Sequence, residues 1–222
     1  MQKLLFSFVL LIFMSISNPC LSQTKPHNGD LLFNIADTTA ASDFAKSIVG
    51  STNRLDQLQI SHVAILCKEK EGWYVLEATS KHGVWMTPLQ DYLDAADKDA
   101  NGHPMVLIGR IRKGVDLKRS IANAKAFIGK KYDFIFNPSD EEMYCSELVQ
   151  KSYVDKKGNL IFQPIPMSFH DSEGRILPYW IDYYLQRDLD VPEGEPGSNP
   201  GQISRDGNVK ILSLFTLGDS KR

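Results

Sequence analysis

Residues 144–149 read Tyr-Cys-Ser-Glu-Leu-Val, and this segment is the most informative one for the fold. It follows a polar loop at 137–140, and its apolar side chains predict a helix that begins near Tyr144 or Cys145. Leu148 and Val149 lie three and four positions after the cysteine, so the sulfur lies on the face that packs against the domain. Unpaired N–H groups and the dipole at a helix start favour a thiolate there. The competing interpretation is a buried core cysteine.

Two upstream segments, His62–Leu66 and Trp73–Ala78, predict strands joined by a charged turn. If the turn is symmetric about Lys68–Glu71, His62 lies directly opposite Glu77. Directly opposed residues point to the same side of a sheet, so the carboxylate can bond one ring nitrogen of the imidazole. A slip of one residue would put the two side chains on opposite faces. Taken alone, a histidine on an apolar strand is more often structural than catalytic.

Together Cys145, His62 and Glu77 form a plausible catalytic triad. The imidazolium and the helix start would hold the thiolate, and His62 would pass its proton to the leaving group. Glu77 would fix the tautomer and orientation of the ring, and the backbone N–H of Cys145 is available to a developing oxyanion. His82 and Asp91 compete with Glu77 for the orienting role.

Four segments together resemble the permuted papain-like NlpC/P60 proteins, specifically the YiiX/YebB-like group. The segments are Gly-Asp-Leu-Leu-Phe at 29–33, Ser-His-Val-Ala-Ile at 61–65, Val-Leu-Glu-Ala at 75–78, and the segment at 144–149. The cysteine helix comes last, as in the circularly permuted branch. The resemblance implies an α+β, papain-like fold in which a small antiparallel sheet carrying His62 packs against the helix carrying Cys145. The resemblance also implies that Glu77 is the third polar residue of the site, after Cys145 and His62.

The residue before the cysteine departs from better-known members of the superfamily. Peptidoglycan peptidases often have Asp there to hold a free amino group of the substrate, whereas this chain has Tyr144. The substrate is therefore not carried over, and Tyr144 is either a substrate-binding residue or a packing residue. Other polar residues are expected to be structural or exposed: Asp30 in a turn, Asp133, Asn137 and Asp140 in loops and caps, and His27, His103 and His170 at the surface. The alternatives are that Asp30 positions the chain near the site and that Asn137 or Asp140 contacts the substrate.

Composition excludes several classes of protein. The 222 residues carry 25 basic and 27 acidic side chains, a net charge of -2, which does not favour a nucleic-acid partner. No ligand spacing predicts a metal, and no cofactor is expected. The chain shows no repeat and no domain boundary, so residues 23–222 are expected to form one domain.

Residues 1–22 have the layout of a signal peptide, with Lys3, an apolar run and a small-residue end. Export to the periplasm or outside the cell is expected, and a lipid anchor at Cys20 is the alternative. No other segment is apolar enough to cross a bilayer. In an oxidising compartment a disulfide between Cys67 and Cys145 is also possible. Otherwise Cys67 is expected to be a buried core residue.

Other elements are expected from local patterns. These are a helix at 42–49 broken at Gly50, a helix capped by Ser120, a helix at 179–185, a Pro/Gly-rich surface excursion at 191–208, and a last strand at 209–215. The excursion is expected to lie over the cleft.

The sequence thus predicts an exported cysteine hydrolase, an amidase or peptidase, that acts on a cell-wall peptide or a related amide. Two alternatives remain open. One is an acyltransferase or lipid ester hydrolase on the same fold, and the other is a non-catalytic binding module.

Overall fold

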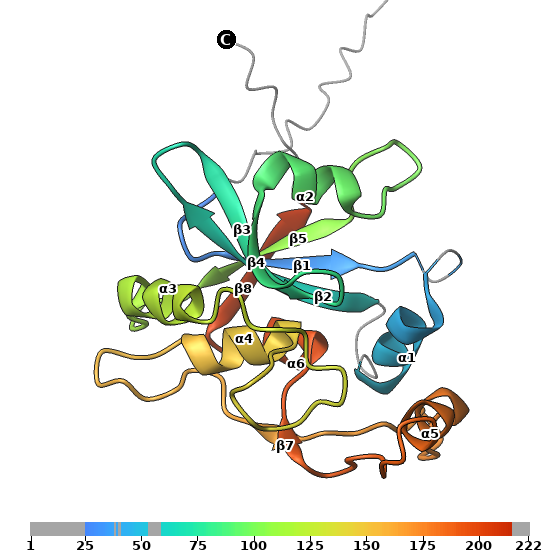
Figure 1. Cartoon of the computed structure of the whole chain (residues 1–222). Helices are drawn as coiled ribbons and strands as arrows, with labels where there is room; N and C mark the ends of the chain where they lie inside the picture. Colours follow the sequence, from blue (N-terminus) through green and yellow to red (C-terminus); the bar gives the residue numbers. More distant parts are fainter. Residues whose placement is uncertain (1–24, 38, 40, 53–58, 215–222) are drawn as a thin grey trace, which may run out of the picture.

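The computed structural model describes residues 25–37, 39, 41–52 and 59–214. Its main element is a six-stranded antiparallel sheet with the strand order β4-β3-β2-β1-β5-β8 (Figure 1). The strands are β1 (Leu31–Ile35), β2 (Ile60–Lys68), β3 (Trp73–Thr79), β4 (Gly83–Pro88), β5 (Val106–Ile111) and β8 (Val209–Leu214), and a short ribbon pairs β6 (Ile165–Pro166) with β7 (Pro196–Gly197). The helices are α1 (Asp43–Thr52), α2 (Leu89–Ala95), α3 (Leu117–Ala126), α4 (Cys145–Ser152), α5 (Pro178–Leu185) and α6 (Pro200–Ser204). The predicted α+β class is confirmed.

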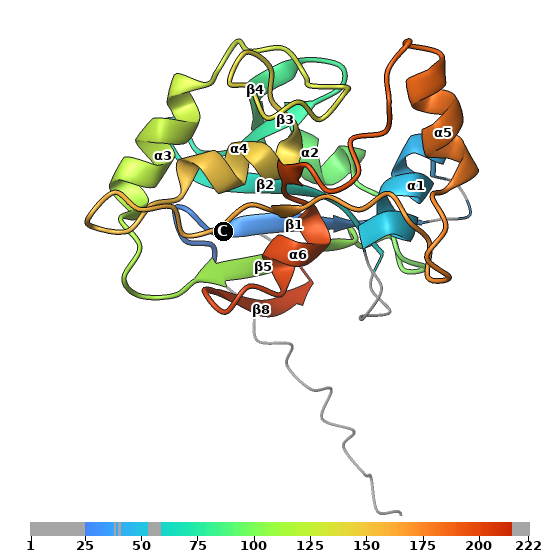
Figure 2. The ribbon, with the colours of Figure 1, turned by 90° about the horizontal axis from the view of Figure 1, so that it is seen from below.

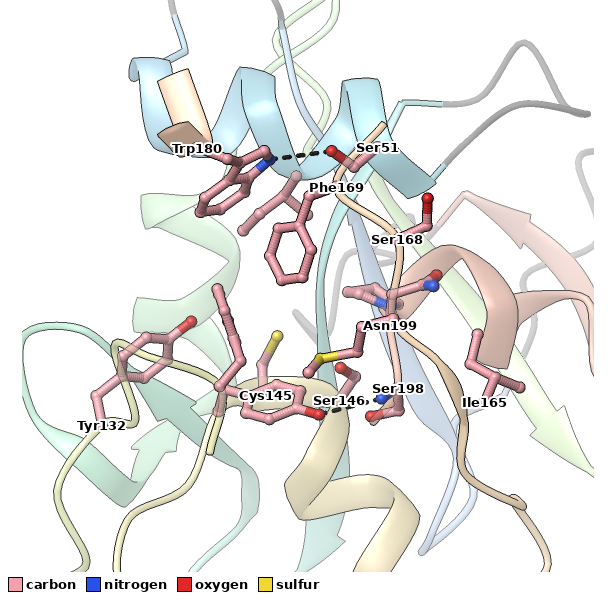
Figure 3. A pocket seen from close by; sticks show the side chains of 15 residues that line it. Ser51, Tyr132, Cys145, Ser146, Ile165, Ser168, Phe169, Trp180, Ser198 and Asn199 are labelled. Atoms are coloured by element: carbon pink, nitrogen blue, oxygen red, sulfur yellow. Dashed lines mark hydrogen bonds between the residues drawn. The ribbon is translucent and has the colours of Figure 1, made fainter. Parts of the chain in front are cut away.

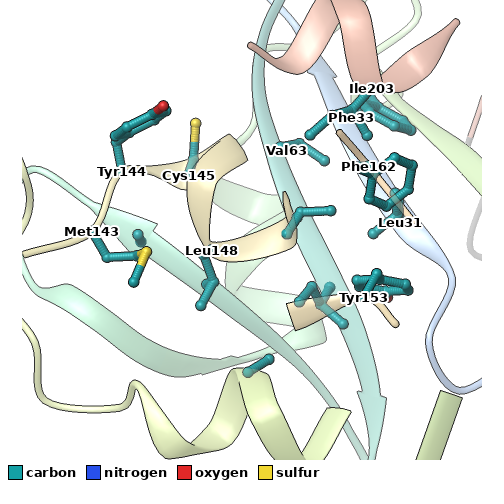
Figure 4. Close-up of a cluster of buried hydrophobic side chains, with 14 of the residues drawn as sticks. Leu31, Phe33, Val63, Met143, Tyr144, Cys145, Leu148, Tyr153, Phe162 and Ile203 are labelled. Atoms are coloured by element: carbon teal, nitrogen blue, oxygen red, sulfur yellow. The ribbon is translucent and has the colours of Figure 1, made fainter. Parts of the chain in front are cut away.

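The two faces of the sheet bury separate hydrophobic clusters, because successive side chains of a strand point to opposite sides. On one face Leu32 and Ala64 pack with residues of α2. Their neighbours Leu31 and Val63 belong to a larger cluster on the other face, which also holds Leu148 of α4. Figures 1 and 2 show this layering, with α2 on one side of the sheet and α4 and α6 on the other. The helix that carries Cys145 therefore packs directly on the sheet (Figure 4).

The register of the β2–β3 hairpin differs by two residues from the predicted one. Lys68 is still in β2, where it pairs with Trp73, and the turn comprises residues 69–72, closed by a 2.9 Å hydrogen bond from the Glu69 N–H to the Gly72 carbonyl. The prediction that His62 lies directly opposite Glu77 was therefore wrong, because the turn begins one residue later than assumed. A shift of two residues leaves both side chains on the same face. The two residues are diagonal neighbours, within reach of long side chains.

Three local predictions were also wrong. Helix α1 continues past Gly50 to Thr52. Helix α3 begins at Leu117, where the carboxylate of Asp116 caps it by accepting the N–H of Arg119 at 3.1 Å, so Ser120 lies inside the helix. The segment 191–208 is not a surface excursion throughout, since it contains β7 and α6.

The expected signal peptide, residues 1–22, lies outside the described residues and stays a prediction, as does the alternative anchor at Cys20. Within the described ranges, no helix combines the length and the apolar character needed to span a bilayer.

Asp30, predicted to be a turn residue, is buried and forms an ion pair with the partly exposed Arg110 of the neighbouring strand β5. Its carboxylate is 2% exposed and accepts hydrogen bonds from Nε and Nη2 of Arg110 at 3.0 and 2.9 Å, and from the N–H of His27 at 2.8 Å. Removing one partner of such a pair leaves a buried charge uncompensated. We expect Arg110→Ala to lower the free energy of unfolding by about 3 kcal/mol in urea titrations. The exposed Arg112→Ala is the control, and equal losses in the two variants would contradict a structural role for the pair.

Candidate active site

Cys145 is the first residue of α4, as the sequence predicted. Tyr144 before it has an extended backbone, with φ of -98° and ψ of 168°, which turns the chain into the helix. The cysteine is 5% exposed and lines a cavity. Cys145 and Cys67 are both free thiols, so the structure contains no disulfide between them.

His62 and Glu77 form the polar pair that the sequence predicted, although in a different register. Nε2 of His62 lies 2.9 Å from Oε2 of Glu77, whose side chain is 8% exposed. The other carboxylate oxygen of Glu77 accepts a hydrogen bond from the hydroxyl of Thr87 at 2.8 Å. Both carboxylate oxygens of Glu77 therefore have partners. Because Thr87 holds the carboxylate in place, the carboxylate in turn fixes the orientation of the His62 ring.

The pKa of His62 indicates that it interacts with Cys145. Burial by itself would lower the pKa of the imidazole. The negative charge of a Cys145 thiolate, together with hydrogen bonds to Cys145 and Glu77, outweighs burial and raises the pKa of His62 from 6.5 to about 10. The surroundings of His62 therefore favour its protonated, imidazolium form.

The other two candidates for orienting His62, His82 and Asp91, make contacts with other residues or with solvent. The ring of His82 stacks on Trp85, with centroids 3.9 Å apart, and the exposed Asp91 is in the first turn of α2. Of the three candidates for the third polar residue, the structure brings Glu77 to His62.

The cavity beside Cys145 has a volume of about 530 Å³, a figure that includes open solvent at its mouth (Figure 3). Aromatic and aliphatic side chains form most of its wall. Phe136, Phe169 and Trp180 pack edge to face or tilted at centroid distances of 5.3–6.3 Å. The remaining residues along the cavity are Ile48, Ser51, Tyr132, Tyr144, Ser146, Ile165, Met167, Ser168, Ser198, Asn199 and Pro200. The three wall aromatics share no local sequence pattern, because they come from loop 133–137, the segment after β6, and α5.

Tyr144 both packs and lines the cavity, so the two predicted roles are combined in one side chain. Its ring packs edge to face on Phe136 at 5.1 Å, and its hydroxyl accepts the N–H of Ser198 at 3.0 Å. Its backbone N–H donates to a carboxylate oxygen of Glu147 at 3.4 Å. These contacts connect the start of α4 to segment 191–208, which the sequence analysis expected over the cleft.

Tyr132 is a further residue at the site that the sequence analysis missed. It is 7% exposed and lines the same cavity as Cys145, and Figure 3 shows its hydroxyl directed toward the cavity. Burial, followed by the charge of Cys145, raises the pKa of the Tyr132 hydroxyl, which therefore stays protonated and able to donate.

Several polar residues named from the sequence do not reach the cavity. Asp133 is buried, and its carboxylate accepts the N–H of Ile135 in the same loop at 2.9 Å. The side-chain oxygen of Asn137 accepts the N–H of Ser139 at 3.0 Å. Asp140 pairs with Lys151. His27 and His103 are exposed as predicted, whereas His170 is half-buried and lies 3.0 Å from Glu193.

A family model described as permuted papain-like amidase enzyme, YaeF/YiiX, C92 family, matches residues 25–213. The chain belongs to this family. The C92 family consists of papain-like cysteine amidases and peptidases, so the chain is a cysteine hydrolase with a permuted papain-like fold. This finding confirms the family and the fold that the sequence predicted.

Two Escherichia coli proteins are similar to this C92 chain. YiiX of strain K12, described as uncharacterized, is 29% identical over 153 residues, which make up 68% of each chain. A crystal structure titled metalloprotein yiiX from strain O157:H7 matches 85% of this chain and 97% of that chain, with a TM-score of 0.66. Its sequence identity of 23% shows a shared fold alone.

The two free cysteines of this C92 chain should differ in reactivity. Cys67 is 0% exposed, and burial raises the pKa of its thiol to about 12, so it stays a thiol. Cys145 lines an open cavity and interacts with His62. At about pH 6 we expect iodoacetamide to alkylate Cys145 at least about tenfold faster than Cys67, as measured by peptide mapping. Equally slow labelling of both would favour a non-catalytic module.

Proposed function

We propose that this chain is an exported cysteine amidase that uses Cys145 as nucleophile, His62 as general acid and base, and Glu77 as the residue that orients His62. The observation that carries the proposal is the 2.9 Å contact between His62 and Glu77, with the same imidazole interacting with a cysteine at a helix start. Export rests on the signal-like pattern of residues 1–22. The remaining residues, 23–222, would form the single catalytic domain.

In the acylation step, the Cys145 sulfur attacks the carbonyl carbon of the amide, and the carbonyl oxygen becomes an oxyanion. The N–H of Cys145 and the hydroxyl of Tyr132 are the donors available to this oxygen. The C–N bond then breaks as His62 passes its proton to the nitrogen, which leaves as an amine. A thioester on Cys145 remains.

In the deacylation step, water attacks the thioester while His62 accepts a proton from it. The C–S bond breaks, the acyl group leaves as a carboxylic acid, and Cys145 regains its thiolate next to an imidazolium. Glu77 stays bonded to Nε2 of His62 throughout, so the other ring nitrogen faces the reaction.

The proposed substrate is an amide in a cell-wall peptide or a related compound of the cell envelope. The apolar cavity also favours a second candidate, hydrolysis or transfer of an acyl group from a lipid ester. Both reactions pass through the same thioester, and they differ in the atom that leaves, nitrogen or oxygen.

The solved relative is titled a metalloprotein. In the part of this chain that the structure describes, no group of three or more His, Cys, Asp or Glu side chains is placed to hold a metal ion. The residues do not fit such a site, and no step above involves a metal.

The proposal is tested with matched amides and esters of the same acyl groups, drawn from peptides and fatty acids. The measured quantities are kcat/KM and, by intact mass, the acyl adduct on Cys145. Cleavage of peptide amides with an adduct on Cys145 supports the amidase. Cleavage of acyl esters alone would establish the second candidate, and the absence of any adduct on Cys145 would overturn both.

A further inference from the structure

Two hydroxyl groups beside Cys145 have no hydrogen-bond partner in the structure. Ser146 is 1% exposed and Ser198 is 7% exposed, and both line the cavity that Cys145 lines. Among the described residues, neither Oγ atom finds a donor or an acceptor. A buried hydroxyl without a partner is costly, so two of them at one cavity indicate groups that a ligand satisfies.

The position of Ser198 is fixed by close packing. Its N–H donates to the Tyr144 hydroxyl at 3.0 Å. A Cβ atom on Gly197 would lie 2.9 Å from that hydroxyl and 2.5 Å from Sδ of Met167, so a larger residue there would require these side chains to shift. Figure 3 shows Ser198 with the hydrogen bond from its N–H, on the same side of the cavity as Ser146 and Cys145. The hydroxyl of Ser198 is therefore preorganised at the cavity.

The cavity offers no carboxylate and no cationic side chain. Among the described residues that line it, none is Asp, Glu, Lys or Arg, and its polar groups besides the Cys145 sulfur are hydroxyls, one amide and the indole N–H of Trp180. A free ammonium group would find no carboxylate there and would be costly to bury. A hydroxyl can both donate and accept, so the pair suits a neutral group such as a secondary amide.

The cavity lies on the acyl side of the scissile bond. The leaving nitrogen has to be next to His62 to receive its proton, but His62 is not among the residues that line the cavity. Tyr132 and Cys145, the oxyanion donors, do line it. The part of the substrate that stays on the sulfur therefore enters the cavity.

We propose that the cavity selects an acyl-side amino acid residue whose α-nitrogen is itself acylated. The apolar side chain of this residue would pack on Phe136, Phe169 and Trp180, and its amide N–H and C=O would bond Ser146 and Ser198. The enzyme would then cleave within N-blocked peptides and reject both free amino termini and plain fatty acyl groups. This inference rests on the proposed function, since it needs Cys145 as nucleophile.

The test uses activated esters, which acylate a reactive cysteine even when the leaving group is not the natural one. Three p-nitrophenyl esters are compared for the Phe and Leu side chains: N-acetylaminoacyl, free aminoacyl, and the acyl analogue without the α-nitrogen. The rate of Cys145 acylation is measured for the wild type, Ser146→Ala, Ser198→Ala and the exposed control Ser172→Ala, with Cys145→Ala as background.

We expect the N-acetyl ester to react at least about tenfold faster than the other two. Ser146→Ala and Ser198→Ala should each lower the acylation rate of the N-acetyl ester about tenfold. They should not lower the rate of the analogue without the α-nitrogen, because it has no amide to bond to the hydroxyls. Ser172→Ala should change no rate. If one serine variant does not fold, the other carries the comparison.

Equal rates for all three esters, or equal losses for all three in the serine variants, would overturn the inference and leave Cys145 as the nucleophile. A faster reaction of the free aminoacyl ester would overturn it as well. Absence of any adduct on Cys145 would instead overturn the proposed function itself.

Discussion

Cys145→Ala is expected to lower kcat/KM for amide hydrolysis at least about 10⁴-fold while the chain stays folded. The thiolate forms the only covalent bond between enzyme and substrate in the proposed mechanism, and alanine cannot form it. The side chain is small and lies at the edge of the cavity, so its loss changes little of the hydrophobic core. The measurement is steady-state hydrolysis of a peptide amide, with a melting curve to show that the variant folds.

Cys67→Ala is the matched control, since Cys67 is the other free and buried cysteine. It should lose stability because a core side chain is shortened, but keep its activity per folded molecule. Activity of Cys145→Ala equal to that of the wild type would mean that another group is the nucleophile.

Changes to the polar pair should produce a graded loss. His62→Ala removes the proton donor and the partner of the thiolate, and we expect kcat to fall by about 10³- to 10⁴-fold. Glu77→Gln keeps the size of the side chain and removes its charge. Because hydrogen bonding and charge from Glu77 both raise the pKa of His62, the pKa should fall in this variant, and the alkaline limit of activity should move to lower pH.

The pH–rate profiles of the wild type and Glu77→Gln provide that measurement. The exposed Glu71→Gln in the same hairpin is the control and should leave the alkaline limit in place. An unchanged profile in Glu77→Gln would show that the carboxylate does not act through the imidazole.

The sequence was sufficient to predict the three residues of the proposed triad because each has a local cue. Cys145 begins a helix, and His62 and Glu77 lie on strands joined by a short charged turn. The face shared by His62 and Glu77 was predicted even though the register was not. The error moved the turn by one residue and the pairing by two, and an even shift preserves the face.

The cavity was not predictable in the same way, because irregular segments build it. Phe136 has a φ of 54°, a left-handed conformation that is unusual for an aromatic residue and that only the surrounding loop explains. Ser198 lies in a Pro/Gly-rich segment whose composition indicates surface chain, yet β7 brings it to Tyr144, 54 positions earlier. The ion pair between Asp30 and Arg110 joins residues 80 positions apart. Contacts of this kind depend on tertiary packing and leave no local pattern.

The proposed mechanism requires that His62 carries a proton beside a Cys145 thiolate before substrate binds. The direct measurement is an ¹⁵N NMR titration of the His62 ring, from about pH 5 to about pH 11, in the wild type and in Cys145→Ala. If His62 pairs with a Cys145 thiolate, His62 should titrate at about 10 in the wild type and at a distinctly lower pH in the variant. In the variant the burial of the ring remains, but the charge of the thiolate is gone. Titration near 6.5 in both proteins would contradict it.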